Sequence, residues 1–271
     1  MNIIKWILSL FKKPKKFVPI LPVNVMGSSW VYTPVINNTT ANWLPYISTP
    51  FESQNLGSWD ELNCVCQSGI NVIEAILNYY YKNNLLPIQL SDFIKNNGYL
   101  NEQGFIKLST RFQAKMAGTT HQGVGMDAFW QSVNRDGILP YTAHPDPVNK
   151  SFNWDEYYQA VPPEVIKAGK LAADIFQFSW QVFKNNEWDA PIIADLKSAL
   201  TNSPIHFASM ICASDSAGIE RWCGAKYYQH ARAVYGVDDY INVLDSEMPA
   251  IKKLELKFPL ACCIKAQLKI S

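Results

Sequence analysis

The sequence predicts an α+β protein, because helical patterns fill its first part and short β-rich segments fill its last part. Up to Leu200, apolar residues recur at helical spacing in several long segments. After Pro204 the segments are short, rich in β-branched residues and partly alternating. The composition, 48% hydrophobic and 17% charged, is that of a globular protein with a buried core.

Five segments are expected to form helices: residues 63–82, 108–117, 126–135, 163–185 and 193–200. The first carries apolar side chains over most of its surface and is therefore expected to be buried. Pro162, Pro163 and Glu164 open the fourth, because a proline in the first turn of a helix interrupts no internal hydrogen bond.

Five β-rich segments follow, at residues 205–213, 231–237, 240–244, 253–258 and 262–270. Asp238 and Asp239 lie between the second and the third, where paired polar residues favour a tight turn. These segments predict a hairpin and, with it, an antiparallel sheet.

The N-terminus combines an apolar run, residues 3–11, with a basic cluster, residues 12–16, that follows it. A secretory signal has the opposite order, so no secretion by a signal peptide is expected. The run is about half as long as a membrane-spanning helix requires. Its apolar residues share one helical face, which predicts an amphipathic helix that docks on a partner, on a membrane surface or on its own domain.

Residues 17–54 are rich in Pro, Asn, Ser and Thr, with interspersed Trp and Tyr. Pro and Asn interrupt regular elements and the aromatic residues supply anchoring surface, so an extended arm is expected. The chain is accordingly divided into residues 1–53, an amphipathic helix and arm that could hold an assembly partner, and residues 54–271, the folded domain.

Charge and cysteine usage exclude several classes of function. The net charge is +1 and there is no phosphate-binding glycine loop, so nucleic acid is not an expected partner. The cysteines form no CxxC pair and the four histidines are scattered, so no metal and no cofactor are expected. Cys64 and Cys66 lie one residue apart, and Cys262 and Cys263 are adjacent, a poor arrangement for disulfides. Mostly reduced thiols are therefore predicted, which favours the cytoplasm.

Cys64 and His230 are the candidates for a nucleophile and its general base. Cys64 follows Asn63, a residue type suited to helix capping, at the start of the most apolar helix, where free N–H groups favour a thiolate. His230 begins a β-rich segment, so its ring can face the helix start from the edge of the sheet. Asp245 ends the next predicted strand and returns alongside His230, which suits an acceptor that orients the imidazole.

These residues and their spacing resemble the papain-like cysteine peptidase family. In that family the nucleophilic Cys is followed four residues later by Ser and ten residues later by Glu, as Cys64 is followed by Ser68 and Glu74. The family's base begins a His-Ala-x-x-x-x-Gly strand, and the segment from His230 to Gly236 has this form.

The similarity extends beyond these two motifs. After a hairpin the family has Asn-Ser, at positions that Asp245 and Ser246 occupy here. Residues 108–112 and 136–141 are similar to the segment that builds the helical lobe of divergent, often phage-encoded, members. The resemblance runs from Gln54 to the C-terminus. It implies a two-lobed fold, with an N-terminal helical lobe and a C-terminal lobe made of an antiparallel sheet or barrel.

The resemblance implies hydrolysis of a polypeptide substrate, with Cys64 as the thiolate nucleophile and His230 as the general acid and base. Asp245 would orient the imidazole, and Gln54 would stabilise the oxyanion together with the backbone N–H of Cys64. The chain departs from the family in several places: Asp245 replaces Asn, Glu247 replaces a shielding Trp, and Gln54 lies ten rather than six residues before the Cys. The nucleophile segment, residues 62–66, reads Leu-Asn-Cys-Val-Cys where the family has Cys-Gly-Ser-Cys-Trp, so the upstream Cys of the common disulfide is absent.

Two other functions stay open at the level of sequence. The differences also suit a catalytically weak or inactive papain-like scaffold, a structural or virion-associated binding protein fastened through residues 1–53. A small Cys–His cell-wall amidase is the third interpretation, although the separation of Cys64 and His230 is longer than such enzymes usually have. The expected location is the host cytoplasm or the virion.

Overall fold

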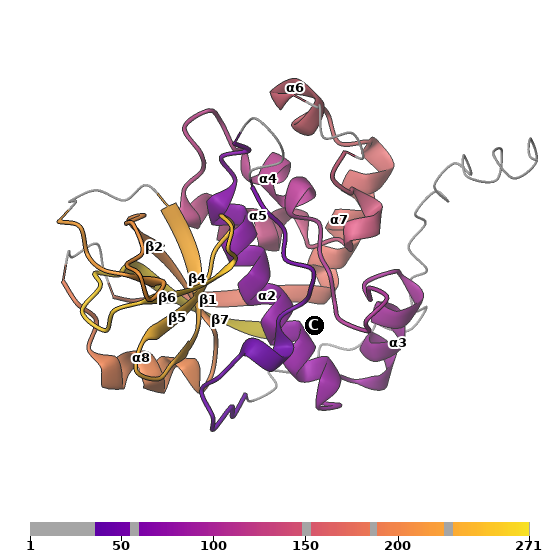
Figure 1. Cartoon of the computed structure of the whole chain (residues 1–271). Coiled ribbons are helices and arrows are strands. Elements are labelled where there is room, and N and C mark those ends of the chain that lie inside the picture. The colour runs from indigo at the N-terminus through magenta and orange to yellow at the C-terminus, as the bar shows by residue number, and fades with distance from the viewer. Residues whose placement is uncertain (1–35, 55–59, 148–152, 185–188, 225–229, 271) are drawn as a thin grey trace, which may run out of the picture.

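A computed structural model describes residues 36–54, 60–147, 153–184, 189–224 and 230–270. A group of helices lies beside a twisted sheet (Figure 1). The helices are α2 (Cys64–Lys82), α3 (Ile88–Asn96), α4 (Thr110–Ala117), α5 (Met126–Asp136), α6 (Trp154–Tyr157), α7 (Pro163–Ile175) and α8 (Ile193–Leu200), with 3-10 turns η1 (Leu44–Tyr46) and η2 (Tyr141–Ala143). The predicted α+β class is confirmed.

The described strands form one seven-stranded sheet with the order β1-β7-β2-β4-β5-β6-β3. Their bounds are β1 (Phe176–Lys184), β2 (Ile205–Ser209), β3 (Ile219–Glu220), β4 (His230–Val237), β5 (Ile241–Leu244), β6 (Ile251–Leu254) and β7 (Ala261–Ile270). Neighbouring strands are antiparallel, as expected, except β3 and β6, which pair in parallel at one edge of the sheet.

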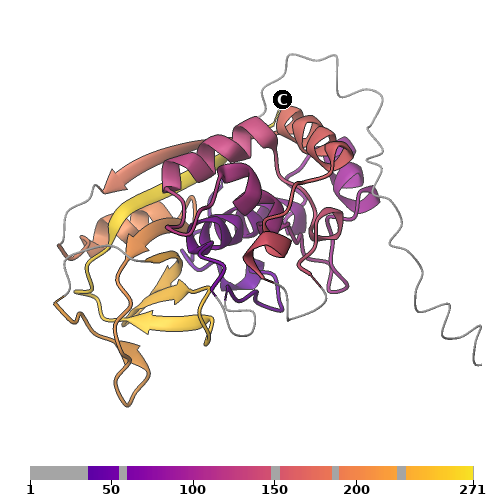
Figure 2. The same ribbon diagram turned by 90° about the horizontal axis from the view of Figure 1, so that it is seen from above.

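Helix α2 connects the helical part to the sheet. It packs against α4 and α5 on the helical side and against β2, β4 and β7 of the sheet. Its side chains are therefore buried from Cys66 to Leu77 almost without interruption, as its apolar sequence predicts. Figure 2 shows the long strands β1 and β7 running beside the helices, with the shorter strands gathered at the other end of the sheet.

The segment expected as one helix over residues 163–185 is wrong in its second half. Helix α7 ends at Ile175, and residues 176–184 form β1, which pairs with β7 along its length. The sequence Phe-Gln-Phe-Ser-Trp-Gln-Val-Phe alternates aromatic or apolar residues with polar ones, a strand pattern that the preceding helical periodicity obscured. A strand thus precedes α8, and the simple order of helices first and strands second is broken.

The expectation of mostly reduced thiols is wrong for two of the six cysteines. Cys212 and Cys223 form a disulfide. They lie eleven residues apart in sequence, on the two sides of a loop that leads into and out of β3, and the loop returns the second thiol to the first. Spacing alone gave no signal of this approach. The other four cysteines form no disulfide, and Cys66 is fully buried in α2.

The described part of the predicted arm, residues 36–54, packs on the folded domain. Trp43 is fully buried, and its indole N–H donates to the carbonyl of Leu200. Backbone bonds from Asn38 to Thr201 and from Trp43 to Tyr235 fix the same segment. The boundary at residue 54 stays a prediction. The amphipathic helix predicted over residues 3–11 lies outside the described residues.

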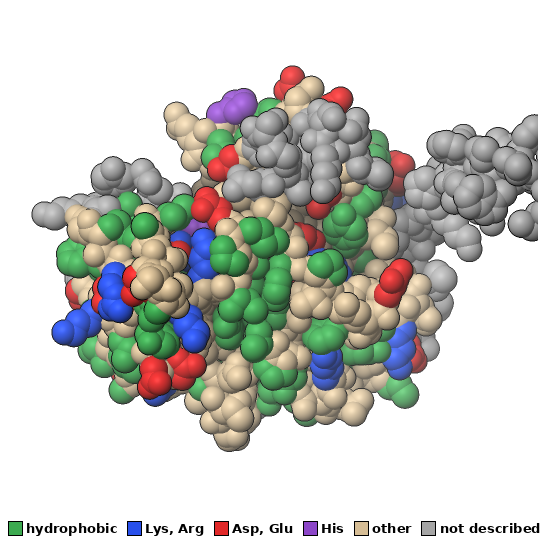
Figure 3. Space-filling view, viewed as in Figure 1, with side chains coloured by type: hydrophobic (Ala, Val, Ile, Leu, Met, Phe, Trp, Pro, Cys, Tyr) green, Lys and Arg blue, Asp and Glu red, His purple; other side chains and the backbone are tan. Residues whose placement is uncertain are grey.

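The face drawn in Figure 3 carries Lys and Arg side chains interspersed with Asp and Glu over the sheet part, and apolar side chains near its middle. Among the described residues, no helix combines the length and the apolar character needed to cross a membrane.

Candidate active site

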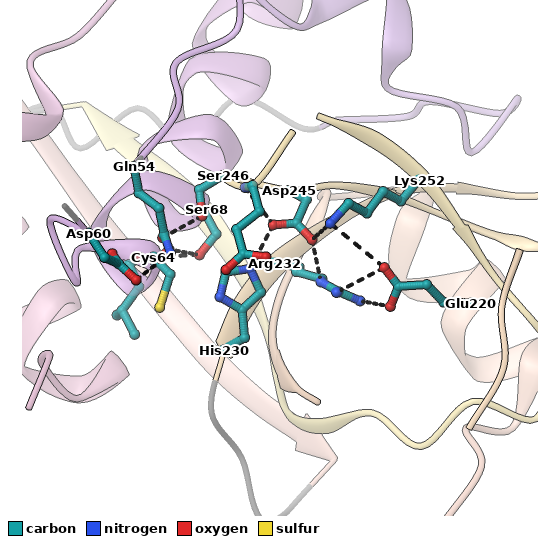
Figure 4. Close-up of polar contacts among 12 residues, drawn as sticks. Gln54, Asp60, Cys64, Ser68, Glu220, His230, Arg232, Asp245, Ser246 and Lys252 are labelled. Carbon is teal, nitrogen blue, oxygen red and sulfur yellow. Dashed lines mark hydrogen bonds and ion pairs between the residues drawn. The ribbon is translucent and has the colours of Figure 1, made fainter. Parts of the chain in front are cut away.

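The N-terminus of α2 and the start of β4 border a cleft of about 910 Å³. Cys64, His230 and Gln54 all line it, although they are far apart in the sequence. Asp245 lies behind His230, away from the cleft (Figure 4). The structure therefore brings together the four residues selected from the sequence.

A turn before α2 presents Cys64 to the cleft. Leu62 has a φ of +52°, a left-handed conformation that is costly for a leucine and is often found beside functional residues. The Asp60 carboxylate supports the turn, because its Oδ1 accepts from the Leu62 N–H at 2.7 Å. Cys64 is the first residue of α2, so its own N–H belongs to the turn whose donors have no partner inside the helix.

Hydrogen bonds to the last residue of α6 and to the residue after it also fix the turn before α2. The Asn63 amide donates to Tyr157 Oη at 2.9 Å and to the Glu61 carboxyl at 2.7 Å, and Tyr158 Oη donates to the Glu61 carbonyl at 2.6 Å. Burial raises the pKa of Glu61 to about 9. Glu61 is therefore protonated at neutral pH, and no negative charge opposes a thiolate from this position.

Ser68, one turn into α2, fixes the first turn of the helix. Its hydroxyl donates to the Cys64 carbonyl at 2.6 Å and lies 2.9 Å from Nε2 of the buried His206. Glu74, the other residue of this motif, accepts from the Leu108 N–H at 2.7 Å. It is a buried structural carboxylate and does not line the cleft.

His230 is held between Asp245 and Cys64. Its Nε2 lies 2.6 Å from Asp245 Oδ1. The hydrogen bond with His230 and the nearby Arg232 charge outweigh burial and hold the pKa of Asp245 below its usual range, so the carboxylate is ionised and can only accept. The Nε2 atom therefore donates to Asp245, which leaves Nδ1 as the nitrogen available to Cys64, whose thiol lines the same cleft.

The balance of forces on His230 favours its charged form. Burial acts to lower the pKa, but the hydrogen bonds and charges of Asp245 and Cys64 outweigh it and raise the pKa to about 9. The side chains of His230 and Asp245 are 1% and 0% exposed, although Glu247 stands where papain-like peptidases have a shielding Trp. Water is thus excluded from this pair without that Trp.

The second oxygen of Asp245 has partners that the sequence analysis missed. Arg232 Nε lies 2.7 Å from Oδ2, as an ion pair without aligned hydrogen-bond geometry, and Lys252 Nζ lies 3.0 Å from it. The available signal was the alternation of β4, since His230 and Arg232 are two residues apart and share one face of the strand.

Gln54 reaches the cleft because its backbone bridges two distant segments. Its N–H donates to the Ser246 carbonyl, and its carbonyl accepts from the Glu61 N–H, both at 3.1 Å. The Ser246 hydroxyl donates to Oε1 at 2.7 Å, which leaves Nε2 as the donor on the side of Cys64 and Asp60 (Figure 4). The Nε2 atom is 3.5 Å from Asp60 Oδ2, a long contact.

The arrangement suits attack by a thiolate on a carbonyl carbon. It supplies a thiol at a helix N-terminus, an imidazole that can take and give a proton, and amide donors beside the thiol. No group of three or more His, Cys, Asp or Glu side chains with the geometry of a metal site occurs within the described part of the chain.

No protein-family model matches the chain, and no curated protein sequence matches it either. Among solved structures it is similar to xylellain, a cysteine protease from Xylella fastidiosa, with a TM-score of 0.48 and 13% identity over 94% of this chain and 92% of that one. A cysteine protease of Carica candamarcensis in complex with E-64 gives 0.47 and 14% over 83% and 96%. Digestive procathepsin L 3 of Tenebrio molitor larval midgut gives 0.45 and 12% over 94% and 75%.

Proposed function

We propose that the protein is a papain-like cysteine peptidase that hydrolyses peptide bonds through Cys64 and His230. The observation that carries the proposal is that the His230 ring binds Asp245 through Nε2 and lines the same open cleft as the Cys64 thiol, whose proximity helps to raise the pKa of the ring. A purely structural role for His230 would not explain why a partly exposed thiol lies at a helix N-terminus in the same cleft.

In the first half of the reaction, the Cys64 thiolate attacks the carbonyl carbon of the scissile peptide. The carbonyl electron pair moves onto oxygen, where the Cys64 N–H and Gln54 Nε2 stabilise the charge. As the tetrahedral species collapses, the C–N bond breaks and the His230 imidazolium gives its proton to the leaving amine.

In the second half, water attacks the thioester and His230 takes its proton. The acid product leaves as the C–S bond breaks, and Cys64 returns to the thiolate paired with the imidazolium. Asp245 keeps Nε2 as the donor nitrogen throughout, so Nδ1 faces the reacting atoms in both halves.

The test is hydrolysis of a quenched fluorescent, unstructured polypeptide by the wild-type chain and by Cys64→Ala. We expect the substitution to abolish activity while the circular dichroism spectrum stays unchanged. A thiol-directed electrophile should modify Cys64 faster than Cys262, which is also partly exposed but has its pKa raised by burial and by the Asp127 charge.

Survival of hydrolysis in Cys64→Ala would overturn the proposal. A folded wild-type chain that neither hydrolyses polypeptide nor reacts at Cys64 would favour the inactive scaffold instead. Digestion of purified peptidoglycan in place of polypeptide would favour the amidase.

A further inference from the structure

A series of buried charges runs from His230 across the sheet, on the side away from the cleft (Figure 4). Beyond Asp245, Arg232 pairs with Glu220 through both of its terminal nitrogens, at 2.9 and 3.2 Å. Lys252 lies 3.0 Å from Asp245 Oδ2 and 3.7 Å from Glu220 Oε1. All these side chains are at most 9% exposed. They come from β4, the end of β5, β6 and β3, the last four strands in the sheet order.

The two oxygens of Asp245 have separate tasks. Oδ1 accepts from His230 and from the Glu247 N–H, at 2.6 and 2.9 Å. Oδ2 faces only cations among these contacts, namely Arg232 and Lys252. A carboxylate held in this way on both sides cannot rotate, so its position relative to the imidazole is fixed.

The charges in this cluster cancel. Asp245 and Glu220 contribute two negative charges, and Arg232 and Lys252 contribute two positive ones. A lone buried carboxylate would hold the imidazolium proton strongly, because its charge acts at short range in a medium of low dielectric constant. The two cations beside its far oxygen partly cancel this charge. The proton affinity of the imidazole is therefore closer to the one it would have beside a neutral amide.

Other charged or titratable groups surround His230 on the elements packed against β4 and in the cleft. The packed elements contribute Cys64 and the buried Cys66 and Glu74 from α2, His206 from β2, and the exposed Asp195 and Lys197 from α8. The cleft lining contributes the exposed His121 and Asp127 and the partly exposed Asp60, Glu247 and Cys262, which water screens. His206 is neutral near pH 7, because burial lowers its pKa to about 3. The charges that act most strongly on the pKa of His230 are therefore those of Cys64 and of the buried cluster that begins at Asp245.

We infer that Arg232, Lys252 and Glu220 are positioning residues that set the proton affinity of His230 through Asp245. The inference rests on the proposed peptidase function. It adds that the cations limit how tightly His230 keeps its proton, so that the ring can still deliver it to a leaving amine. The negative charge of Glu220 in turn reduces the effect of the two cations on Asp245.

Opposite shifts from two substitutions test this. Lys252→Gln removes a cation and should raise the titration midpoint of His230 by about 0.5 to 1 pH unit. Glu220→Gln removes an anion of the same cluster and should lower the midpoint by a similar amount. Lys252→Arg keeps the charge and should restore the wild-type value. The midpoint is read by NMR in the full chain with ¹³C-labelled histidines, with the His230 signal assigned through His230→Gln.

The remaining histidines serve as internal controls, and urea unfolding verifies that each variant is folded. Unchanged midpoints in folded Lys252→Gln and Glu220→Gln, or shifts of the same sign in both, would overturn the inference. The alkaline limb of peptide hydrolysis should move with the midpoint. If the wild-type chain hydrolyses no peptide but the midpoints still move in opposite directions, the proposed function fails and the control of His230 stands.

Discussion

The two sides of the cleft hold their reactive groups by different means. On the helix side, Cys64 sits on a turn fixed by hydrogen bonds to neutral groups and to one partly exposed carboxylate, Asp60. On the sheet side, His230 rests on a cluster of ionised, buried side chains. Neutral dipoles place a group without depending on pH, whereas buried charges set its proton affinity and become destabilising when one of them is removed.

This contrast predicts which variants lose stability and which lose only catalysis. Substitutions on the sheet side should lower both the free energy of unfolding and the rate of peptide hydrolysis. Substitutions on the helix side should lower mainly the rate of hydrolysis.

Asp245→Asn should be strongly destabilising, although Asn is the residue that papain-like peptidases carry at this position. The substitution leaves Arg232 and Lys252 with only Glu220 and creates a buried excess positive charge. We expect a loss of about 3–5 kcal/mol in the free energy of unfolding, measured by urea denaturation. The decline of hydrolysis at alkaline pH should also begin at a lower pH, because the substitution removes an anion that raises the pKa of His230.

The matched control is Asp239→Asn, at the exposed tip of the same hairpin. It should change the free energy of unfolding by less than about 0.5 kcal/mol. An Asp245→Asn protein as stable as the wild type would contradict the view that the charges on the sheet side depend on one another.

Gln54→Glu should act on the rate. The carboxylate keeps an acceptor for the Ser246 hydroxyl but removes the amide donor beside Cys64. Loss of one oxyanion donor typically lowers kcat by about 10² to 10³-fold, and KM should change little. Steady-state kinetics with one peptide measures both. A kcat within threefold of the wild type would exclude Gln54 from the oxyanion site.

The pH dependence of the wild type should carry the signature of the sheet side. Since the folded His230 has its pKa raised to about 9, the imidazolium persists across neutral pH, and hydrolysis should fall as pH rises through about 9. The raised pKa also stabilises the fold below the unfolded value of about 6.5, and this contribution is lost as pH rises toward 9. Urea unfolding between pH 6.5 and 9 should show the decline, and His230→Gln should remove it.

The positions of the two principal candidate residues could be predicted from the sequence because their signals are local. Cys64 starts an apolar helix and His230 starts a strand, and both positions are found in the structure as expected. Asp245 followed from the hairpin between β4 and β5, whose length sets what returns beside His230. Helices at 126–135 and 193–200 were also recovered, since their period is clear over their whole length.

Most of the missed features depend on contacts that no local pattern encodes. Arg232, Lys252 and Glu220 come from three strands, and the two-residue β3 gives no periodic signal of its own. The alternation of β4 places Arg232 on the face of His230 but does not indicate its partners. The disulfide of Cys212 and Cys223 depends on how a loop closes. Strand β1 is the exception, because its alternating sequence is a local strand pattern that the helical periodicity before it obscured.

The smallest expected effect concerns substrate preference and arises from the charged residues that line the cleft. Asp60 and Asp127 line the cleft from the helix side and Glu247 lines it from the sheet side, while its described lining includes no Lys or Arg. These carboxylates are at least partly exposed, so water and salt screen them, unlike the buried cluster. They should nevertheless favour peptides with basic side chains over peptides with acidic ones.

Asp127→Asn should reduce the ratio of kcat/KM for paired Arg-containing and Glu-containing peptides by about two- to fivefold at low salt. The change should shrink at 0.5 M salt, because the Debye length falls to about 4 Å. Asp92→Asn, an exposed acid on α3 outside the cleft, is the control and should leave the ratio unchanged. A ratio insensitive to both Asp127→Asn and salt would mean that the surface charges of the cleft do not select the substrate, and that the charges which matter to this protein lie in the sheet behind His230.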